Sequence, residues 1–261
     1  MKSYGESQLN NLRQSGRIMR GIFALLEKEI CAGVNTLELD RIAEQYIRDN
    51  GAEPSFKGYD GYRFTLCTSI NEESIHGIPR KNKILRDGDI ISIDCGVRYP
   101  AGKGGMCTDA ARTYAVGEIS KEARDLIKTC EQSFHAAAKD LRAGDKISKI
   151  GEKIDTFIDG RYGILEKYVS HGVGEKVHQE PHMIPNYDVR KSTKNRAKMI
   201  EMTEARFVEG AVIAIEPMIN LGTHDVRVLG DGWTVVTADG SLAAHYENTV
   251  IIQKHGIEIV T

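Results

Sequence analysis

The sequence predicts an α+β fold of two pseudo-symmetric halves, because two patterns each occur twice in its 261 residues. Residues 85–94 and 207–216 each combine a turn, in which an acid precedes glycine, with a strand that ends in a carboxylate, Asp94 or Glu216. Residues 32–47 and 143–158 share the apolar spacing of a helix with one buried side. The period is too long for a solenoid, so we expect two halves that share one sheet.

The other elements repeat in the same order. Helical patterns at about 8–30 and 120–141 precede the two repeated helices, and second strands at 107–114 and 245–252 follow the two acid-ending strands. Each half therefore consists of helix, helix and hairpin. We expect a single domain over residues 1–261, with halves of about 5–117 and 118–261, helices on the outer side of the sheet, and a cleft between the halves.

The composition is that of a compact protein without a strong charge bias. Hydrophobic residues make up 41% and charged residues 28%, and the net charge is only -2, which gives no indication of nucleic-acid binding. The apolar stretch 22–26 is too short for a signal sequence or a membrane span. We therefore expect a cytoplasmic protein without membrane association. Five cysteines without a Cys-x-x-Cys pair indicate reduced, mostly buried thiols.

The acids at the strand ends indicate the wall of a pocket. Side chains two positions apart share one face of a strand, so Asp94 lies on the face of Ser92, and Glu216 lies on the face of Ala214. The opposite faces are apolar. A single strand of this kind would be interpreted as a solvated edge strand with its polar side in water. Because the pattern occurs twice, we favour the other interpretation, in which each acid points inward among small neighbours.

Each second strand adds another acid, Asp109 in the first half and Glu247 in the second. Four carboxylates aimed at one cleft would repel one another, and at least one would take up a proton unless a cation lay between them. Arg112 falls on the other face of its strand. Divalent metal ions fit better, because two such ions balance four carboxylates.

Histidines complete the candidate site. His76 and His171 are each followed by glycine, and His178 lies in the same glycine-containing stretch as His171. The spacing of His171 and His178 is not the i, i+4 pair of a zinc-binding helix, so we expect one to bind metal and the other substrate. The remaining histidines outside such settings are expected to lie outside the site: His135, His182, His224 and His255.

Several short motifs together resemble the type I methionine aminopeptidases. They are Cys-Thr-Ser-Ile-Asn-Glu at 67–72, His-Gly-Ile-Pro at 76–79, Asp-Gly-Asp-Ile-Ile-Ser-Ile-Asp at 87–94, Thr-Asp at 108–109, His-Gly-Val-Gly at 171–174, Ile-Glu-Pro-Met at 215–218, Asp-Gly-Trp-Thr at 231–234 and Tyr-Glu at 246–247. The resemblance runs from about residue 5 to the end. It implies the pita-bread fold with its curved antiparallel sheet, and removal of the initiator methionine from nascent polypeptides.

The resemblance also implies a hydrolytic site with two divalent ions. Asp94 and Asp109 would hold one ion, His171 and Glu216 the other, and Asp109 and Glu247 would bridge both. This mostly oxygen-donor set suits Mn, Fe or Co and is less typical of Zn. The sequence does not determine which of the four ions is used.

The resemblance assigns the remaining catalytic roles to three residues. Glu216 would carry protons as well as bind metal, His178 would donate to the carbonyl oxygen of the substrate, and His76 would contact the peptide nitrogen beyond the scissile bond.

The resemblance also places Tyr59, Tyr62, Cys67 and Trp233 around the methionine side chain. Aromatic rings and a thiol suit a flexible thioether. Val177 occupies a position where the family often has phenylalanine, so a wider pocket is expected.

Two departures from the family pattern stand out. The hairpin loop at 98–107 is longer than expected, and a one-residue slip there would turn Asp109 away from the metals. Between Tyr187 and Arg206, a basic insertion is either a solvated loop, with a helical turn at 199–205, or a contact for ribosomal RNA. Its basic residues are Arg190, Lys191, Lys194, Arg196 and Lys198.

Two alternatives remain open at this stage. Proline-directed aminopeptidases and dipeptidases share the fold and the five ligands, but usually carry an additional amino-terminal domain. A non-catalytic pita-bread protein would serve as a binding partner, but typically lacks some ligands, whereas all five are present here. We expect a monomer that acts on the amino-terminal segment of nascent chains.

Overall fold

The computed structural model of the protein describes residues 1–191 and 196–261. Lys194, within the predicted basic contact at 190–198, lies outside the described residues, and so does the side chain of Arg196.

The four predicted helices are present. They are α1 (Glu6–Glu29), α2 (Thr36–Asp49), α3 (Lys121–Ala138) and α4 (Ser148–Ile158). The Asn35 side chain accepts the N–H of Glu38 at the start of α2, and Ser120 accepts that of Ala123 at the start of α3. Such caps satisfy amide groups that have no partner within the helix. The turn expected at 199–205 is helix α5 (Arg196–Thr203), and a 3-10 turn, η1, spans Tyr59–Gly61.

The strands form one large sheet and two small ones. The large sheet has the order β1-β4-β5-β14-β9-β7-β8, with β2 beside β4 and β15 beside β14. The small sheets have the orders β13-β10-β6 and β11-β12-β3. The strand bounds are β1 Glu53–Pro54, β2 Leu66–Ile70, β3 Glu73–Ile75, β4 Ile90–Tyr99, β5 Met106–Ala115, β6 Gly163–Ile164, β7 Ser170–Gly172, β8 Gln179–Ile184, β9 Val212–Ile215, β10 Met218–Asn220, β11 Val226–Val228, β12 Val235–Thr237, β13 Ala243–His245, β14 Glu247–Gln253 and β15 Gly256–Ile259.

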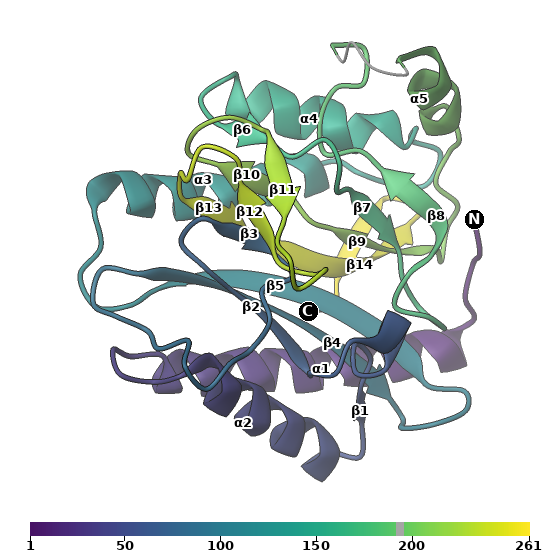
Figure 1. Ribbon diagram of the computed structural model, residues 1–261. Coiled ribbons are helices and arrows are strands. Elements are labelled where there is room, and N and C mark those ends of the chain that lie inside the picture. The colour runs from purple at the N-terminus through teal and green to yellow at the C-terminus, as the bar shows by residue number, and fades with distance from the viewer. Residues whose placement is uncertain (192–195) are drawn as a thin grey trace.

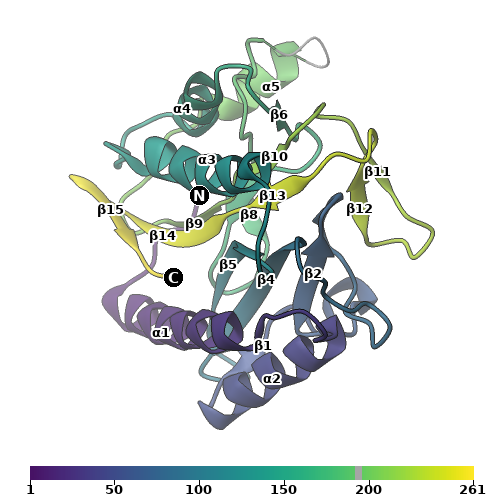
Figure 2. The ribbon, with the colours of Figure 1, turned by 90° about the vertical axis from the view of Figure 1, so that its left-hand side faces the viewer.

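The long helices cover one face of the large sheet, one pair on each half (Figure 1). Helices α1 and α2 pack on Ile91, Ile93 and Cys95 of β4, whereas α3 and α4 pack on Ile213 and Ile215 of β9. Figure 2 shows the two pairs on either side of the strands that join the halves. Because strand side chains alternate, the neighbours of these isoleucines, including Asp94, lie on the uncovered face.

The hairpin between β4 and β5 corrects the expected loop. The strands pair through Tyr99 opposite Met106, so the loop comprises residues 100–105 and the predicted bounds of 98–107 were wrong. The register places Asp109 opposite Gly96 and Asp94 opposite Ala111. Both acids therefore lie on the same face, because the extra residues are accommodated beyond the paired strands and do not cause a slip.

Across the described ranges, no helix combines the length and the apolar character needed to cross a bilayer.

Candidate metal centre and substrate pocket

The pairing registers bring the four acids to one face of the large sheet. Asp94 lies opposite Ala111, and Ala111 lies opposite Glu247 on the next strand. Asp109, two positions from Ala111, shares that face. In the second half, Ile215 of β9 lies opposite Asn248 of the antiparallel strand β14. The next pair along these two strands is Glu216 and Glu247. The carboxylates thus come from both halves and meet where β5 pairs with β14.

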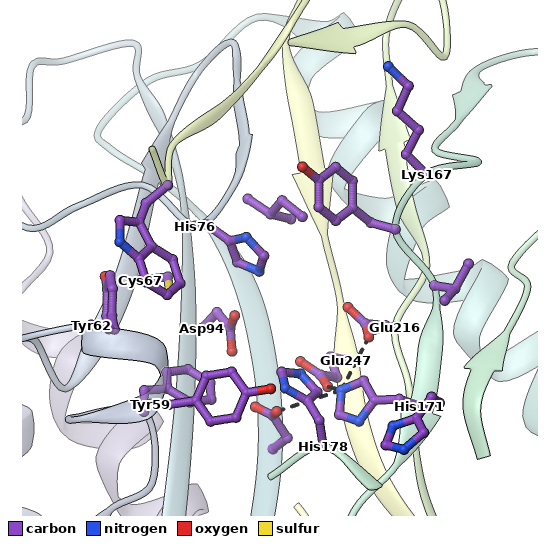
Figure 3. Close-up of a pocket in the computed structure, with 17 residues that line it drawn as sticks. Tyr59, Tyr62, Cys67, His76, Asp94, Lys167, His171, His178, Glu216 and Glu247 are labelled. Carbon is purple, nitrogen blue, oxygen red and sulfur yellow. Dashed lines mark ion pairs between the residues drawn. The ribbon is translucent and has the colours of Figure 1, made fainter. Parts of the chain in front are cut away.

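His171 joins this face from β7, where it lies opposite Ala214. Its Nε2 atom is 3.4 Å from Glu216 Oε1, 3.8 Å from Asp109 Oδ2 and 3.9 Å from Glu247 Oε1 (Figure 3). Three overlapping groups could hold an ion, each with ligand atoms within 4.8 Å of one another: Asp94, Asp109 and Glu247; His171, Glu216 and Glu247; and Asp109, His171 and His178.

The tautomer of His171 leaves a lone pair directed at the acids. Nδ1–H donates to the carbonyl oxygen of Gly172 at 3.0 Å, so in the neutral ring Nε2 carries no proton. Burial is the main cause that lowers the pKa of His171 to about 3, which makes the ring neutral at pH 7. A lone pair surrounded by carboxylate oxygens is the arrangement of a histidine that binds a metal through Nε2.

The carboxylates also lack the partners that buried charges require. Among the described residues, Oδ1 of Asp94, Oδ1 of Asp109 and Oε1 of Glu247 are buried without a hydrogen-bond partner. Burial raises the pKa of Asp94 to about 7, and burial together with the neighbouring acids raises the pKa values of Asp109 and Glu247 well above their usual range. Divalent cations would remove this penalty, so the residues fit a metal centre.

Two sets of hydrogen bonds fix the backbone of the acids. The N–H of Glu216 donates to Ser170 Oγ, Ser170 donates to Asn186 Oδ1, and Asn186 Nδ2 donates to the carbonyl of Glu216. The hydroxyl of Thr249 accepts the N–H of Asp109 at 2.8 Å and donates to its carbonyl at 2.9 Å. Buried side chains therefore fix the backbone of both residues.

A cavity of about 340 Å³ opens beside the acids. Its aromatic and apolar wall is formed by Phe56, Tyr59, Tyr62, Cys67, Ile75 and Trp233 (Figure 3). The rings of Tyr62 and Trp233 are 4.8 Å apart. Val177 does not line the cavity but packs behind its wall, in one cluster with Phe56, Tyr62 and Cys67. The cavity thus combines an apolar side with an acidic floor.

His76 and His178 also line the cavity. Burial lowers the pKa of His76 to about 4 and also lowers that of His178, so both rings are neutral at pH 7. The ring of His178 lies 4.2 Å from that of His171, centroid to centroid. The turn that carries His76 requires glycine at position 77, because a Cβ there would lie 2.2 Å from the carbonyl oxygen of Thr68.

The structure corrects the expectation for His182. It lines the cavity, because β8 pairs with the strand that carries His171. His245 was also missed: Nε2 is 3.5 Å from Glu216 Oε2 and 3.8 Å from Glu247 Oε2. Its position two residues before Glu247 was the available signal. Arg112 points away from the acids, as expected, and lies over the rings of Phe23 and Tyr246.

Comparison with known proteins identifies the family of the chain. The model of one family, described as metallopeptidase family M24, matches residues 10–254. The chain belongs to metallopeptidase family M24. Among its M24 relatives, the methionine aminopeptidase of Clostridium acetobutylicum is 44% identical over 257 residues, which cover 98% of this chain and 96% of that protein.

Solved M24 structures are similar over the whole chain. Methionine aminopeptidase from Thermotoga maritima has a TM-score of 0.90 and 32% identity, with 100% of this chain and 99% of that chain covered. A prolidase from Pyrococcus furiosus has a TM-score of 0.75 at 21% identity, with 99% of this chain but only 65% of that chain covered. The prolidase shows the fold alone. The pita-bread fold and the resemblance to methionine aminopeptidases are confirmed.

Proposed function

We propose that this M24 metallopeptidase hydrolyses the first peptide bond of nascent polypeptides and releases the initiator methionine. The observation that carries the proposal is the buried Nε2 of His171, which faces carboxylates of both halves at 3.4 to 3.9 Å. The methionine aminopeptidases among its relatives support the substrate. Neither the proline-directed nor the non-catalytic alternative is favoured.

The proposed metal ligands are Asp94, Asp109, His171, Glu216 and Glu247. Four carboxylates balance two divalent ions. Asp109, His171 and Glu247 each belong to two candidate ion groups, and of these the family resemblance makes the carboxylates Asp109 and Glu247 the ones that would bridge both ions. Divalent ions bound there would lower the pKa of a water from 15.7 toward roughly 7 and so supply the hydrolytic nucleophile at neutral pH. Co, Mn, Fe and Zn remain the candidates.

The other steps are assigned to side chains of the cavity. Glu216 would take the proton of the attacking water and pass it to the leaving amine, since its carboxylate lies at the edge of the cavity. His178 would donate to the developing oxyanion through the one N–H that its neutral ring carries. His76, which also lines the cavity, would contact the peptide nitrogen beyond the scissile bond.

The apolar wall is proposed to select the methionine side chain. Tyr59, Tyr62, Cys67 and Trp233 would surround the thioether. Val177 acts through the packing of this wall, and its small size leaves the neighbouring rings more room than phenylalanine would. We therefore expect tolerance of side chains slightly larger than methionine.

The test is a metal titration on protein that has first been stripped with a chelator. Peptides beginning Met-Ala, Met-Gly and Ala-Pro would be offered with Mn, Co, Fe and Zn in turn. Release of methionine from the first two peptides only, and only with metal, supports the proposal. Cleavage of the Ala-Pro peptide would favour the proline-directed alternative, and no cleavage of any peptide would favour the non-catalytic one.

We further propose that the enzyme acts as a cytoplasmic monomer and contacts ribosomal RNA through residues 190–198. Arg190 and Lys191 have side chains 55% and 63% exposed, although they also pair with Asp188 and Asp155. Replacing Lys191 and Lys198 by glutamate should weaken salt-sensitive co-sedimentation with ribosomes. Equal binding of the variant and the wild type would contradict the proposed contact with ribosomal RNA.

A further inference from the structure

His245 lies at the end of β13, beside the metal centre but outside the cavity wall. Its side chain is 3% exposed, and Nε2 has no hydrogen-bond partner among the described residues. The hydroxyl of Thr113 fixes the backbone of His245, because it accepts the N–H at 3.0 Å and donates to the carbonyl at 2.9 Å. A buried nitrogen without a partner is costly, and its position therefore calls for an explanation.

The two glutamates lie between His245 and His171. His171 Nε2 is nearest to Oε1 of both Glu216 and Glu247, at 3.4 and 3.9 Å. His245 Nε2 is nearest to Oε2 of both, at 3.5 and 3.8 Å. Each glutamate therefore has one oxygen directed at each ring. Nδ1–H of His171 is already bonded to a carbonyl, which leaves its Nε2 as a lone pair.

The neighbours of His245 favour the opposite tautomer. Its Nε2 lies 3.5 and 3.8 Å from two carboxylate oxygens, which only accept hydrogen bonds, so a proton on Nε2 is favoured. The ring would then act as a donor. Carboxylates that bind metals are commonly fixed by such hydrogen bonds from outside the ligand set.

We propose that His245 is a positioning residue. Its Nε2–H, 3.5 Å from Oε2 of Glu216 and 3.8 Å from Oε2 of Glu247, would donate to these oxygens when the centre is occupied and so keep the Oε1 atoms directed at the metal site. The inference rests on the proposed metal centre. The hydrogen bonds with Ser170 and Asn186 hold only the backbone of Glu216, whereas His245 would hold its side chain. Without this donor, Glu216 can rotate about its side-chain bonds, and metal affinity falls.

The experiment compares Mn²⁺ binding to chelator-stripped wild type, His245→Leu, His245→Gln and the exposed control His255→Leu by calorimetry. Leucine fills the space without a donor, whereas glutamine retains an N–H. We expect a loss of Mn²⁺ affinity of about 10- to 100-fold in His245→Leu. His245→Gln and His255→Leu should stay within about threefold of the wild type, since the donor or the site is retained.

A second readout separates binding from folding. Thermal unfolding with and without Mn²⁺ should show a smaller metal-induced rise in Tm for His245→Leu than for His245→Gln. If His245→Leu does not fold, His245→Asn, whose amide is too short to reach, takes its place. Equal affinity of the donor-free variant and the wild type would overturn the assignment, as would a glutamine variant as weak as leucine. Absence of Mn²⁺ binding to the wild type would instead overturn the proposed metal centre.

Discussion

Tyr4 holds Gln179, the residue that follows His178. Gln179 Nε2 donates to the Tyr4 hydroxyl at 2.6 Å, and the N–H of Glu175 approaches the same oxygen at 3.4 Å. Lys2 pairs with the Glu175 side chain at 2.6 Å. The first residues of the chain thus bind the loop that carries His178 at two points, Glu175 within it and Gln179 at its end, although they lie more than 170 positions away in sequence.

We expect Tyr4→Phe to lower kcat about 3- to 10-fold and to leave Mn²⁺ affinity unchanged. The substitution removes one buried hydroxyl, which is worth about 1 kcal/mol, and loosens the loop without touching a proposed ligand. Steady-state kinetics with a Met-Ala peptide measures kcat, and calorimetry measures the metal. Tyr114→Phe, a hydroxyl removed elsewhere, is the control. An unchanged kcat in Tyr4→Phe would show that the hydroxyl does not position His178.

His178→Ala should lower kcat by about 10² to 10³ while the bound metal stays the same. The ring lies 4.2 Å from His171, centroid to centroid, and is assigned to the developing oxyanion, where loss of one donor has an effect of this size. Metal content after dialysis shows whether the centre is intact. If metal is lost together with activity, His178 is a ligand, as its membership of a candidate ion group with Asp109 and His171 would allow.

Metal binding should release protons at pH 7. In the metal-free protein, burial raises the pKa of Asp94 to about 7, and burial together with the neighbouring acids raises the pKa of Glu247 well above its usual value, so protons are held on the acids. Ligands must lose their protons to bind, and affinity therefore rises as the pH increases through these pKa values. Calorimetry in buffers of different ionisation enthalpy should show net proton release, with about half a proton per protein from Asp94 alone. A value of zero would mean that the acids are already ionised.

The sequence repeats predicted the helices and the orientation of the strand side chains, because both depend on the local spacing of apolar residues. Apolar spacing placed the four long helices, and alternation placed Asp94 and Glu216 on the face opposite the isoleucines that pack on those helices. The combination of the acids into one centre follows from strand pairing between the halves. The repeated strand-end acids and the cleft expected between the halves indicated it beforehand, and the family resemblance assigned the individual ligands.

Residues that act through tertiary contacts could not be predicted in the same way. His182 and His245 lack the glycine neighbours that distinguished His171, and each reaches the site because its strand pairs with another strand. Tyr4 reaches the site from the opposite end of the sequence. The ends of the hairpin loop at 100–105 were also missed, because the two strands stay paired as far as Tyr99 and Met106, beyond the expected bounds.

Asp40 provides a prediction about stability that is independent of the metal centre. It lies on α2, is 4% exposed, and its Oδ1 accepts the N–H groups of Thr65 and Leu66 at 2.8 Å each. Burial outweighs these two bonds and raises the pKa of Asp40 from 3.8 to about 6. The folded state therefore holds the proton more tightly than the unfolded chain, and the associated stability is full below pH 4 and lost as the pH rises through about 6.

Asp40→Asn should remove this dependence, because the amide keeps an acceptor oxygen for Thr65 and Leu66 but does not titrate. The free energy of unfolding of the wild type, relative to that of the variant, should fall by about 2–3 kcal/mol between pH 4 and pH 7. Urea unfolding of the metal-free proteins across this range measures it, and taking the difference cancels the titration of the acids that both proteins share. Asp49→Asn, at the exposed end of the same helix, controls for loss of a carboxylate. A difference that is constant with pH would mean that Asp40 stays ionised in the folded state, its charge stabilised by the two backbone N–H groups.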